Sequence, residues 1–255
     1  MNFIETAILS IVEGLTEFLP ISSTGHMILV LALLKPENQE FLKTFEISIQ
    51  LGAILAIVLL YAKNFIKDTT LYKKILVAFL PTAIIGFFFY KIIKAYFFNP
   101  ILVSITLIIG GIILILIDKI ISRQEGKYTT LKDLSYQNAF FIGLIQSISI
   151  IPGVSRSAAT IIGGVLNGFN KKQAAEFSFL LAIPTMFAAT GYDLLKVSSH
   201  LSGQEYLFIV IGSLISFVSA WLAVKFFLRF IEKHGFTFFG YYRIILGLLF
   251  LWYLK

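Results

Sequence analysis

The stretch EGLTEFLPISSTGH, residues Glu13–His26, decides the fold of this chain. It combines two carboxylates, two serines, a histidine, a proline and two glycines within a single short segment. Proline removes a backbone donor and glycine adopts conformations that other residues avoid, so the stretch predicts a break in a helix. The flanking residues are apolar enough to lie in a lipid bilayer. A break this rich in polar side chains is therefore a candidate functional site.

The composition indicates an integral membrane protein. The 255 residues are 58% hydrophobic and 14% charged, with a mean hydropathy of +0.88, whereas an average soluble domain is about 25% charged. The net charge of +7 fits Lys and Arg in loops beside anionic lipid, so we expect no nucleic-acid partner. The absence of cysteine excludes thiolate chemistry. Acidic residues interrupt the first apolar stretch, so we expect no cleavable signal peptide.

Six predominantly apolar runs are long enough to cross a bilayer, whose hydrocarbon core takes about 20 helical residues. The last run is the least certain of the six because it contains Arg243. The predicted spans are Thr44–Tyr61, Ile75–Ile93, Pro100–Ile117, Phe177–Tyr192, Tyr206–Val224 and Phe238–Leu254.

Two further segments, Asn2–Leu34 and Gln137–Asn170, are broken in the middle, at LPISSTG and IPGVSRS. Each half is about 12–15 residues, or about 18–22 Å as a helix. That length reaches the middle of a bilayer and returns, so both segments are predicted to be re-entrant hairpins. Their non-helical tips must be shielded by protein, because backbone exposed to lipid is costly.

The chain also repeats itself, with an offset of about 130 residues. We expect one integral membrane domain, residues 1–255, with repeat 1 at about 1–125 and repeat 2 at about 133–255. Each half then holds one hairpin and three spans, and the odd number of spans inverts the second half relative to the first. The matched pairs are Gly14 with Gly143, Glu17 with Gln146, Pro20 with Pro152, Ser22 with Ser155, Glu46 with Glu176 and Ser48 with Ser178.

The distribution of basic residues predicts the orientation. Counting along this topology places fourteen Lys and Arg on one face and six on the other, with Arg156 set aside. By the positive-inside rule the richer face, which includes Arg243, is cytoplasmic. The first hairpin then enters from the outside and the second from the cytoplasm, so that their tips meet. We expect a multi-pass protein of the bacterial plasma membrane whose site faces the outer, periplasmic side.

Glu13 and Glu17 are spaced i, i+4 and share one helix face. Adjacent carboxylates repel each other and are expensive in lipid, and a divalent cation relieves both problems. Hard cations prefer oxygen ligands. The pair therefore predicts a site for Mg²⁺ or Ca²⁺; the alternative is an interfacial helix with a hydrated face.

The second half of the first hairpin starts with hydroxyl residues that cap helices well. Free N–H groups at such a helix start favour an anion, which makes Ser22, Thr24 and Gly25 candidate substrate-binding residues. A serine there, Ser23 among the candidates, can attack phosphorus if a base removes its proton, and His26 lies one turn further on. The residues leave open which serine attacks, and ordinary helix capping beside a satisfied histidine is the alternative.

The second break offers matching chemistry. Gly153 permits a tight turn and Ser155 can cap the next half-helix, with Ser157 following it. Arg156 presents a planar fork of donors suited to phosphate, and Arg at this depth is rarely structural. The alternative for Arg156 is a buried ion pair, with Glu17 as the partner.

The motifs EGLTEFLPISSTGH and PGVSRSAAT resemble the two signature segments of the bacterial undecaprenyl-diphosphate phosphatase family, also called the bacitracin-resistance protein family, and the resemblance covers essentially the whole chain. It implies removal of the terminal phosphate from the C55 isoprenyl diphosphate lipid, recycling the carrier for cell-wall synthesis and conferring bacitracin resistance. It implies a divalent cation at Glu13 and Glu17, and catalytic roles for Glu17, Ser23, His26 and Arg156.

The hypothesis is that the lipid diphosphate lies between the hairpin tips and that Ser23 attacks it with His26 as base. Direct attack by water is equally compatible with the residues. A transporter or flippase for polyprenyl phosphate lipids is the alternative function, because inverted repeats with broken helices are typical of transporters. A homodimer is a further possibility that the sequence leaves open.

Overall fold

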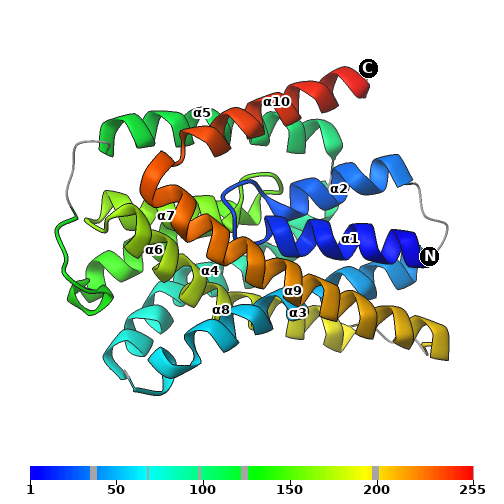
Figure 1. Ribbon diagram of the computed structural model, residues 1–255, viewed down its shortest axis with the longest axis horizontal. Helices are drawn as coiled ribbons and strands as arrows, with labels where there is room; N and C mark the ends of the chain where they lie inside the picture. Colours follow the sequence, from blue (N-terminus) through cyan, green and yellow to red (C-terminus); the bar gives the residue numbers. More distant parts are fainter. Residues whose placement is uncertain (35–38, 68, 97–98, 122–125, 197–200, 255) are drawn as a thin grey trace.

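A computed structural model describes residues 1–34, 39–67, 69–96, 99–121, 126–196 and 201–254. Within these residues the chain is all-helical, with ten α-helices, two 3₁₀ turns and no strand (Figure 1). Lys35, Arg123 and Lys255, which enter the charge count above, lie outside the described residues. The α-helices are α1 Phe3–Thr16, α2 Ser23–Leu34, α3 Gln39–Lys67, α4 Thr69–Tyr96, α5 Pro100–Ile121, α6 Tyr136–Ser147, α7 Arg156–Leu166, α8 Lys171–Lys196, α9 Gly203–His234 and α10 Thr237–Tyr253.

The first predicted break separates α1 from α2. Helix α1 begins at a capping box in which the Asn2 side chain accepts from the Glu5 N–H and the Glu5 carboxylate accepts from the Asn2 N–H. The helix ends before Pro20, and Ser22 has a φ of +71°. A serine in this left-handed region is strained by about 1–3 kcal/mol, which the surrounding structure must offset.

The second predicted break separates α6 from α7. A 3₁₀ turn, Ile148–Ile150, follows α6 directly, and Gly153 then turns the chain with a φ of +89°. Ser155 also has a positive φ, +77°, and its Oγ accepts from the Ala158 N–H at 3.1 Å, which caps α7. Both breaks thus place a serine in the left-handed region immediately before the helix that follows.

Five of the described helices are long and apolar enough to span a bilayer: α3, α4, α5, α8 and α9. They contain five of the six predicted spans, and the sixth coincides with the 17-residue α10. The predicted span Tyr206–Val224 lies within α9, which continues to His234 and measures 32 residues. Large apolar side chains point outward, including Phe88 and Trp252 at 73% and 77% exposure. The chain is a multi-pass membrane protein.

The broken helices pack against long ones in corresponding ways. Helix α1 lies along α9, α6 lies along α4, and α5 and α10 run side by side (Figure 1). Gly14 allows α1 to approach α9 closely, because it has no side chain at the contact. A Cβ at this position would lie only 2.5 Å from the Ser216 carbonyl oxygen. Gly143, its predicted repeat partner, allows the same approach to Ala78 in the α6–α4 contact.

Arg243 departs from its predicted place. The orientation count assigned it to the cytoplasmic face, but its side chain is fully buried at 0% exposure, on the part of α10 that faces the two breaks. When Arg243 is left out of the count, the predicted cytoplasmic face still has thirteen basic residues against six on the other face, which favours the same orientation.

Candidate active site at the two helix breaks

The two breaks, 139 residues apart in sequence, are in contact. Nη2 of Arg156 donates to Oε1 of Glu17 at 3.0 Å, and both side chains are largely buried. Ser157 reinforces the contact, because its Oγ donates to the Phe18 carbonyl oxygen at 2.7 Å. The ion pair that the sequence left open as an alternative for Arg156 is therefore formed. It also brings the predicted phosphate-binding guanidinium beside the predicted carboxylate.

Glu17 also joins the first break to the start of α2. The Ser23 hydroxyl donates to Oε2 of Glu17, while Oε1 accepts from Arg156. Ser23 and Glu17 are 7% and 8% exposed, so this hydrogen bond lies in a largely dry environment. A carboxylate that accepts a serine O–H is placed to take its proton, which is the arrangement of an activated nucleophile.

Both ring nitrogens of His26 have hydrogen-bond partners other than Ser23. Its Nδ1 lies 2.7 Å from the Ser22 carbonyl oxygen, and its Nε2 lies 2.8 Å from the hydroxyl of Tyr242 on α10. A carbonyl only accepts, so Nδ1 carries the proton and Nε2 accepts from the tyrosine. The two rings are stacked, with an interplanar angle of 2°. In this structure the Ser23 hydroxyl has the Glu17 carboxylate as its hydrogen-bond partner, so the expectation that His26 is the base for Ser23 stays a prediction.

The two Nη atoms of Arg156 have partners, whereas its Nε has none among the described residues. Nη1 donates to the Ser178 carbonyl oxygen at 3.2 Å, and Nη2 also contacts Sδ of Met186 at 3.5 Å. Thr160 supports this arrangement, because its hydroxyl lies 2.5 Å from that of Ser178. Nε is buried with no hydrogen-bond partner among the described residues, so the guanidinium retains a donor for a ligand.

Glu13 has an unused carboxylate oxygen. The side chain is 1% exposed, its carboxyl interacts with that of Glu17, and its Oε1 has no hydrogen-bond partner within the described part of the chain. Two buried carboxyls in contact require a shared proton or a cation. The donor set is all oxygen, which fits a hard divalent cation that takes its remaining ligands from substrate and water.

A cavity of about 150 Å³ lies between the breaks. Of the residues predicted from the sequence, Glu17, Ser22, Ser23, Thr24, Gly153, Ser155 and Arg156 line it. Gly25 and Ser157 instead stabilise the breaks, since the Gly25 N–H donates to Ser22 Oγ at 3.2 Å and Ser157 holds Phe18. The wall also includes residues that the sequence did not single out: Gln50, Ser149, Thr185, Met186, Ala189 and Thr190.

Comparison with known proteins shows the family of this chain. The family model described as bacitracin resistance protein BacA matches residues 6–249. The chain belongs to the BacA family. A protein of Sulfurihydrogenibium sp. (strain YO3AOP1) named undecaprenyl-diphosphatase is 52% identical over 254 residues, covering 99% of this chain and all of that protein. A protein of the same name from Aquifex aeolicus (strain VF5) is 52% identical, with 96% of each chain covered. Another from Wolinella succinogenes is 49% identical, with 100% of this chain and 99% of that protein covered.

In this BacA family chain, sequence reasoning missed the contributions of two later helices. Ser178 and Met186 of α8 hold Arg156, and Tyr242 of α10 holds His26. The repeat paired Ser178 with Ser48, and this match was the sequence feature that could have pointed to Ser178. Nothing in the local sequence around Tyr242 indicated a partner 216 residues earlier.

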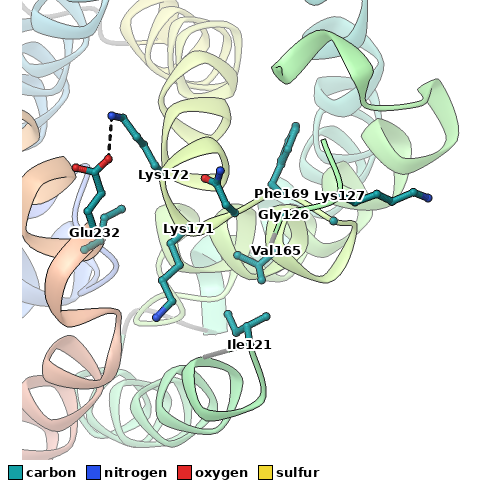
Figure 2. A pocket seen from close by; sticks show the side chains of 11 residues that line it. Ile121, Gly126, Lys127, Val165, Phe169, Lys171, Lys172 and Glu232 are labelled. Atoms are coloured by element: carbon teal, nitrogen blue, oxygen red, sulfur yellow. Dashed lines mark ion pairs between the residues drawn. The ribbon is translucent and has the colours of Figure 1, made fainter. Parts of the chain in front are cut away.

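A larger cavity of about 860 Å³ lies elsewhere in the BacA chain, among the ends of α5, α7, α8 and α9 (Figure 2). Three lysines line it, but they do not converge. Lys172 pairs with Glu232 at 2.9 Å, Lys171 pairs with Asp118 at 2.5 Å, and Figure 2 shows Lys127 pointing away from both. The arrangement does not form an anion site, and it shares no residue with the cavity at the breaks.

Proposed function

We propose that this chain is an undecaprenyl-diphosphatase, which removes the terminal phosphate of undecaprenyl diphosphate and so returns undecaprenyl phosphate to cell-wall synthesis. The observation that carries the proposal is the Glu17 carboxylate shared between the Ser23 hydroxyl and the Arg156 guanidinium, in a cavity between two broken helices. The names of its relatives support the same reaction.

Substrate binding follows from the two helix starts. The first N–H groups of α2 and α7 have no partner within their own helices and carry the positive ends of the helix dipoles, so they favour the diphosphate. Arg156 opens α7 and adds a guanidinium with a free Nε–H. Charge that develops on the phosphoryl oxygens meets donors already in place, which lowers the barrier.

The reacting atoms are provided by Ser23 and Glu17. Ser23 Oγ attacks the terminal phosphorus and loses its proton to Glu17, while the bond from phosphorus to the bridging oxygen breaks and the lipid monophosphate leaves. Water then attacks the phosphoserine, and inorganic phosphate and free Ser23 result. The rival route is direct attack by water on the diphosphate. Trapping a radiolabelled phosphoserine at Ser23 in quenched reactions supports the first route, and its absence supports the second.

A divalent cation belongs to this proposal. Glu13, through its unpartnered Oε1, and Glu17 are the residues that would hold it. When bound, such a cation neutralises the diphosphate and polarises its oxygens. Glu13 has no other partner for that oxygen among the described residues, which is why we assign it to the metal rather than to proton transfer.

The site belongs to an inverted-repeat architecture in a single membrane domain. Both halves have the same order of elements, a broken helix pair followed by three helices. The close contacts at Gly14 and Gly143 correspond, and the count along the predicted topology gives more basic residues on one face than on the other. We infer that the broken pairs are re-entrant hairpins entering from opposite sides of the plasma membrane, and that the cavity opens to the periplasmic side.

The proposal is tested with the full chain purified in detergent, undecaprenyl diphosphate and Mg²⁺, by measuring phosphate release. Arg156→Ala is expected to lose at least about 100-fold in kcat/KM, because charge-assisted donors in a dry site are removed. Arg229→Ala changes an exposed arginine of α9 and is expected to retain activity. Lipid movement in sealed vesicles without hydrolysis in detergent would contradict the enzyme and favour a flippase.

A further inference from the structure

Arg243 is the largest fully buried side chain in the described part of the protein, and the mechanism above does not use it. All five of its N–H donors are satisfied by backbone carbonyl oxygens. Nη1 donates to Pro20 and Val154, each at 3.1 Å. Nη2 donates to Gly153 at 2.8 Å and to Thr106 at 3.3 Å, and Nε donates to Leu107 at 3.3 Å.

These carbonyls come from both breaks. Pro20 lies in the break between α1 and α2, and Gly153 and Val154 lie in the break between α6 and α7. One nitrogen, Nη1, is therefore hydrogen-bonded to both breaks at the same time. The remaining two carbonyls belong to α5, so the guanidinium connects the breaks to a spanning helix as well.

The charge of Arg243 is stabilised without an acidic partner. No carboxylate lies within salt-bridge range of it among the described residues. Each of the five backbone carbonyl oxygens around the guanidinium carries partial negative charge, and together they stabilise the cation. A buried guanidinium is costly unless every donor is paired, which this site achieves.

The neighbouring helix is shaped to admit the guanidinium. A Cβ placed on Gly110 of α5 would overlap Nη2 of Arg243. Glycine costs about 1 kcal/mol in a helix relative to alanine, so its presence here has a packing reason. The adjacent Gly110–Gly111 pair makes room for this side chain.

We propose that Arg243 is a positioning residue for the phosphatase reaction, a guanidinium clamp that sets the separation of the two breaks. The proposal rests on the proposed function. Glu17 lies in the first break, Ser23 begins the helix after it and Arg156 begins the helix after the second break. The separation of the breaks therefore sets how nucleophile, base and phosphate-binding group face one another. Both breaks contain a serine at positive φ, and such strained turns need external hydrogen bonds to hold one geometry.

The consequence is a defect in kcat rather than in binding. A misplacement of reacting groups by about 1 Å costs about 100-fold in rate. Lysine at 243 offers three donors from one point instead of a five-donor fork, so it cannot bridge both breaks and α5 together. We expect Arg243→Lys to lower kcat about 10-fold to 100-fold per folded protein, with KM changed less than about threefold.

A second variant keeps the arginine and displaces it. Gly110→Ala places a methyl group against Nη2, whereas Gly247→Ala crowds the same α5–α10 contact elsewhere, with its Cβ 2.6 Å from the Ser104 carbonyl oxygen. Both variants are expected to lower the thermal unfolding temperature in detergent. Only Gly110→Ala is expected to lower kcat by tenfold or more, because a general loss of stability leaves the kcat of the folded fraction unchanged.

The assay uses the full chain in detergent, with the folded fraction measured by size-exclusion chromatography. A kcat loss in Arg243→Lys and Gly110→Ala that is absent in Gly247→Ala supports the clamp. Wild-type kcat in either of the first two variants, or an equal loss in Gly247→Ala, overturns it. If Arg243→Lys gives no folded protein, the glycine pair decides alone. A wild-type chain that releases no phosphate overturns the proposed function instead.

Discussion

The Ser23 hydroxyl donates a hydrogen bond to Oε2 of Glu17, six residues earlier and on the far side of the break between α1 and α2. The break makes this contact possible, because in a continuous helix residues six apart lie on different faces. A serine and a carboxylate are thereby joined in a buried environment, where proton transfer between them needs no solvent. The proposed activation of Ser23 depends on this one contact.

Replacing Glu17 with Gln tests that contact. Glutamine keeps the size of the side chain but cannot accept the Ser23 proton, so we expect kcat to fall about 10²-fold to 10⁴-fold, the range of general-base catalysis. Glu5→Gln is the matched control, since Glu5 caps the start of α1 and pairs with the N-terminal ammonium group, away from the cavity at the breaks. Its kcat should stay within about twofold of wild type. Near-normal turnover in Glu17→Gln would remove Glu17 as the base.

Ser23→Ala separates the two chemical routes. If Ser23 is the nucleophile, phosphate release falls to the background and no phosphoserine is trapped. If water attacks directly, the variant retains a substantial fraction of wild-type turnover. Ser104→Ala removes a buried serine of α5 and should leave turnover unchanged. Among the described residues its hydroxyl bonds only to the Pro100 carbonyl oxygen, in its own helix, at 2.9 Å.

Local sequence chemistry was enough to predict the breaks. Pro20, Gly153 and the capping serines act within a few residues of themselves, so their effect can be derived without a tertiary structure. The pairing of Arg156 with a carboxylate was also within reach, because a buried guanidinium needs a counter-charge and few carboxylates lie at that depth.

The roles of His26 and Arg243 depended on a helix far away in sequence. His26 was assigned to Ser23 by its spacing of three residues, but Tyr242 occupies its Nε2 from α10. Arg243 was counted with the cytoplasmic cations, although it lies inside the predicted span Phe238–Leu254, because Lys and Arg usually mark the cytoplasmic face. Its five carbonyl partners come from three separate segments, and no local pattern encodes such a meeting.

Glu13→Gln tests the metal assignment. Glutamine removes the charge of the carboxyl whose Oε1 has no hydrogen-bond partner among the described residues. We expect the Mg²⁺ concentration for half-maximal activity to rise about 10-fold to 100-fold, the usual effect of weakening a metal site. Glu232→Gln, which changes the partner of Lys172 at the larger cavity, should leave the Mg²⁺ curve in place. A Glu13→Gln curve that overlays wild type would contradict the assignment.

Tyr242→Phe tests the orientation of His26. The change removes the 2.8 Å hydrogen bond to Nε2 and keeps the stacked ring. One such bond is worth about 1 kcal/mol, so we expect kcat/KM to fall about fivefold. Tyr241→Phe changes the adjacent residue, which is 54% exposed, and should have no effect. Equal activities of the two variants would show that the ring alone orients the imidazole.

Gly143→Ala tests the close α6–α4 packing that supports the second break. A Cβ on Gly143 would overlap the carbonyl group of Ala78, which is backbone and cannot rotate aside. Overpacking of this kind costs about 1–3 kcal/mol, so we expect a lower thermal unfolding temperature in detergent. Gly191→Ala is the matched control on α8, where nothing lies within 4 Å of the added Cβ. Its unfolding temperature should equal or exceed that of wild type, because alanine favours the helix. The same temperature for both variants would mean that α6 can move away from α4, and the corresponding α1–α9 contact at Gly14 would then have to be tested in the same way.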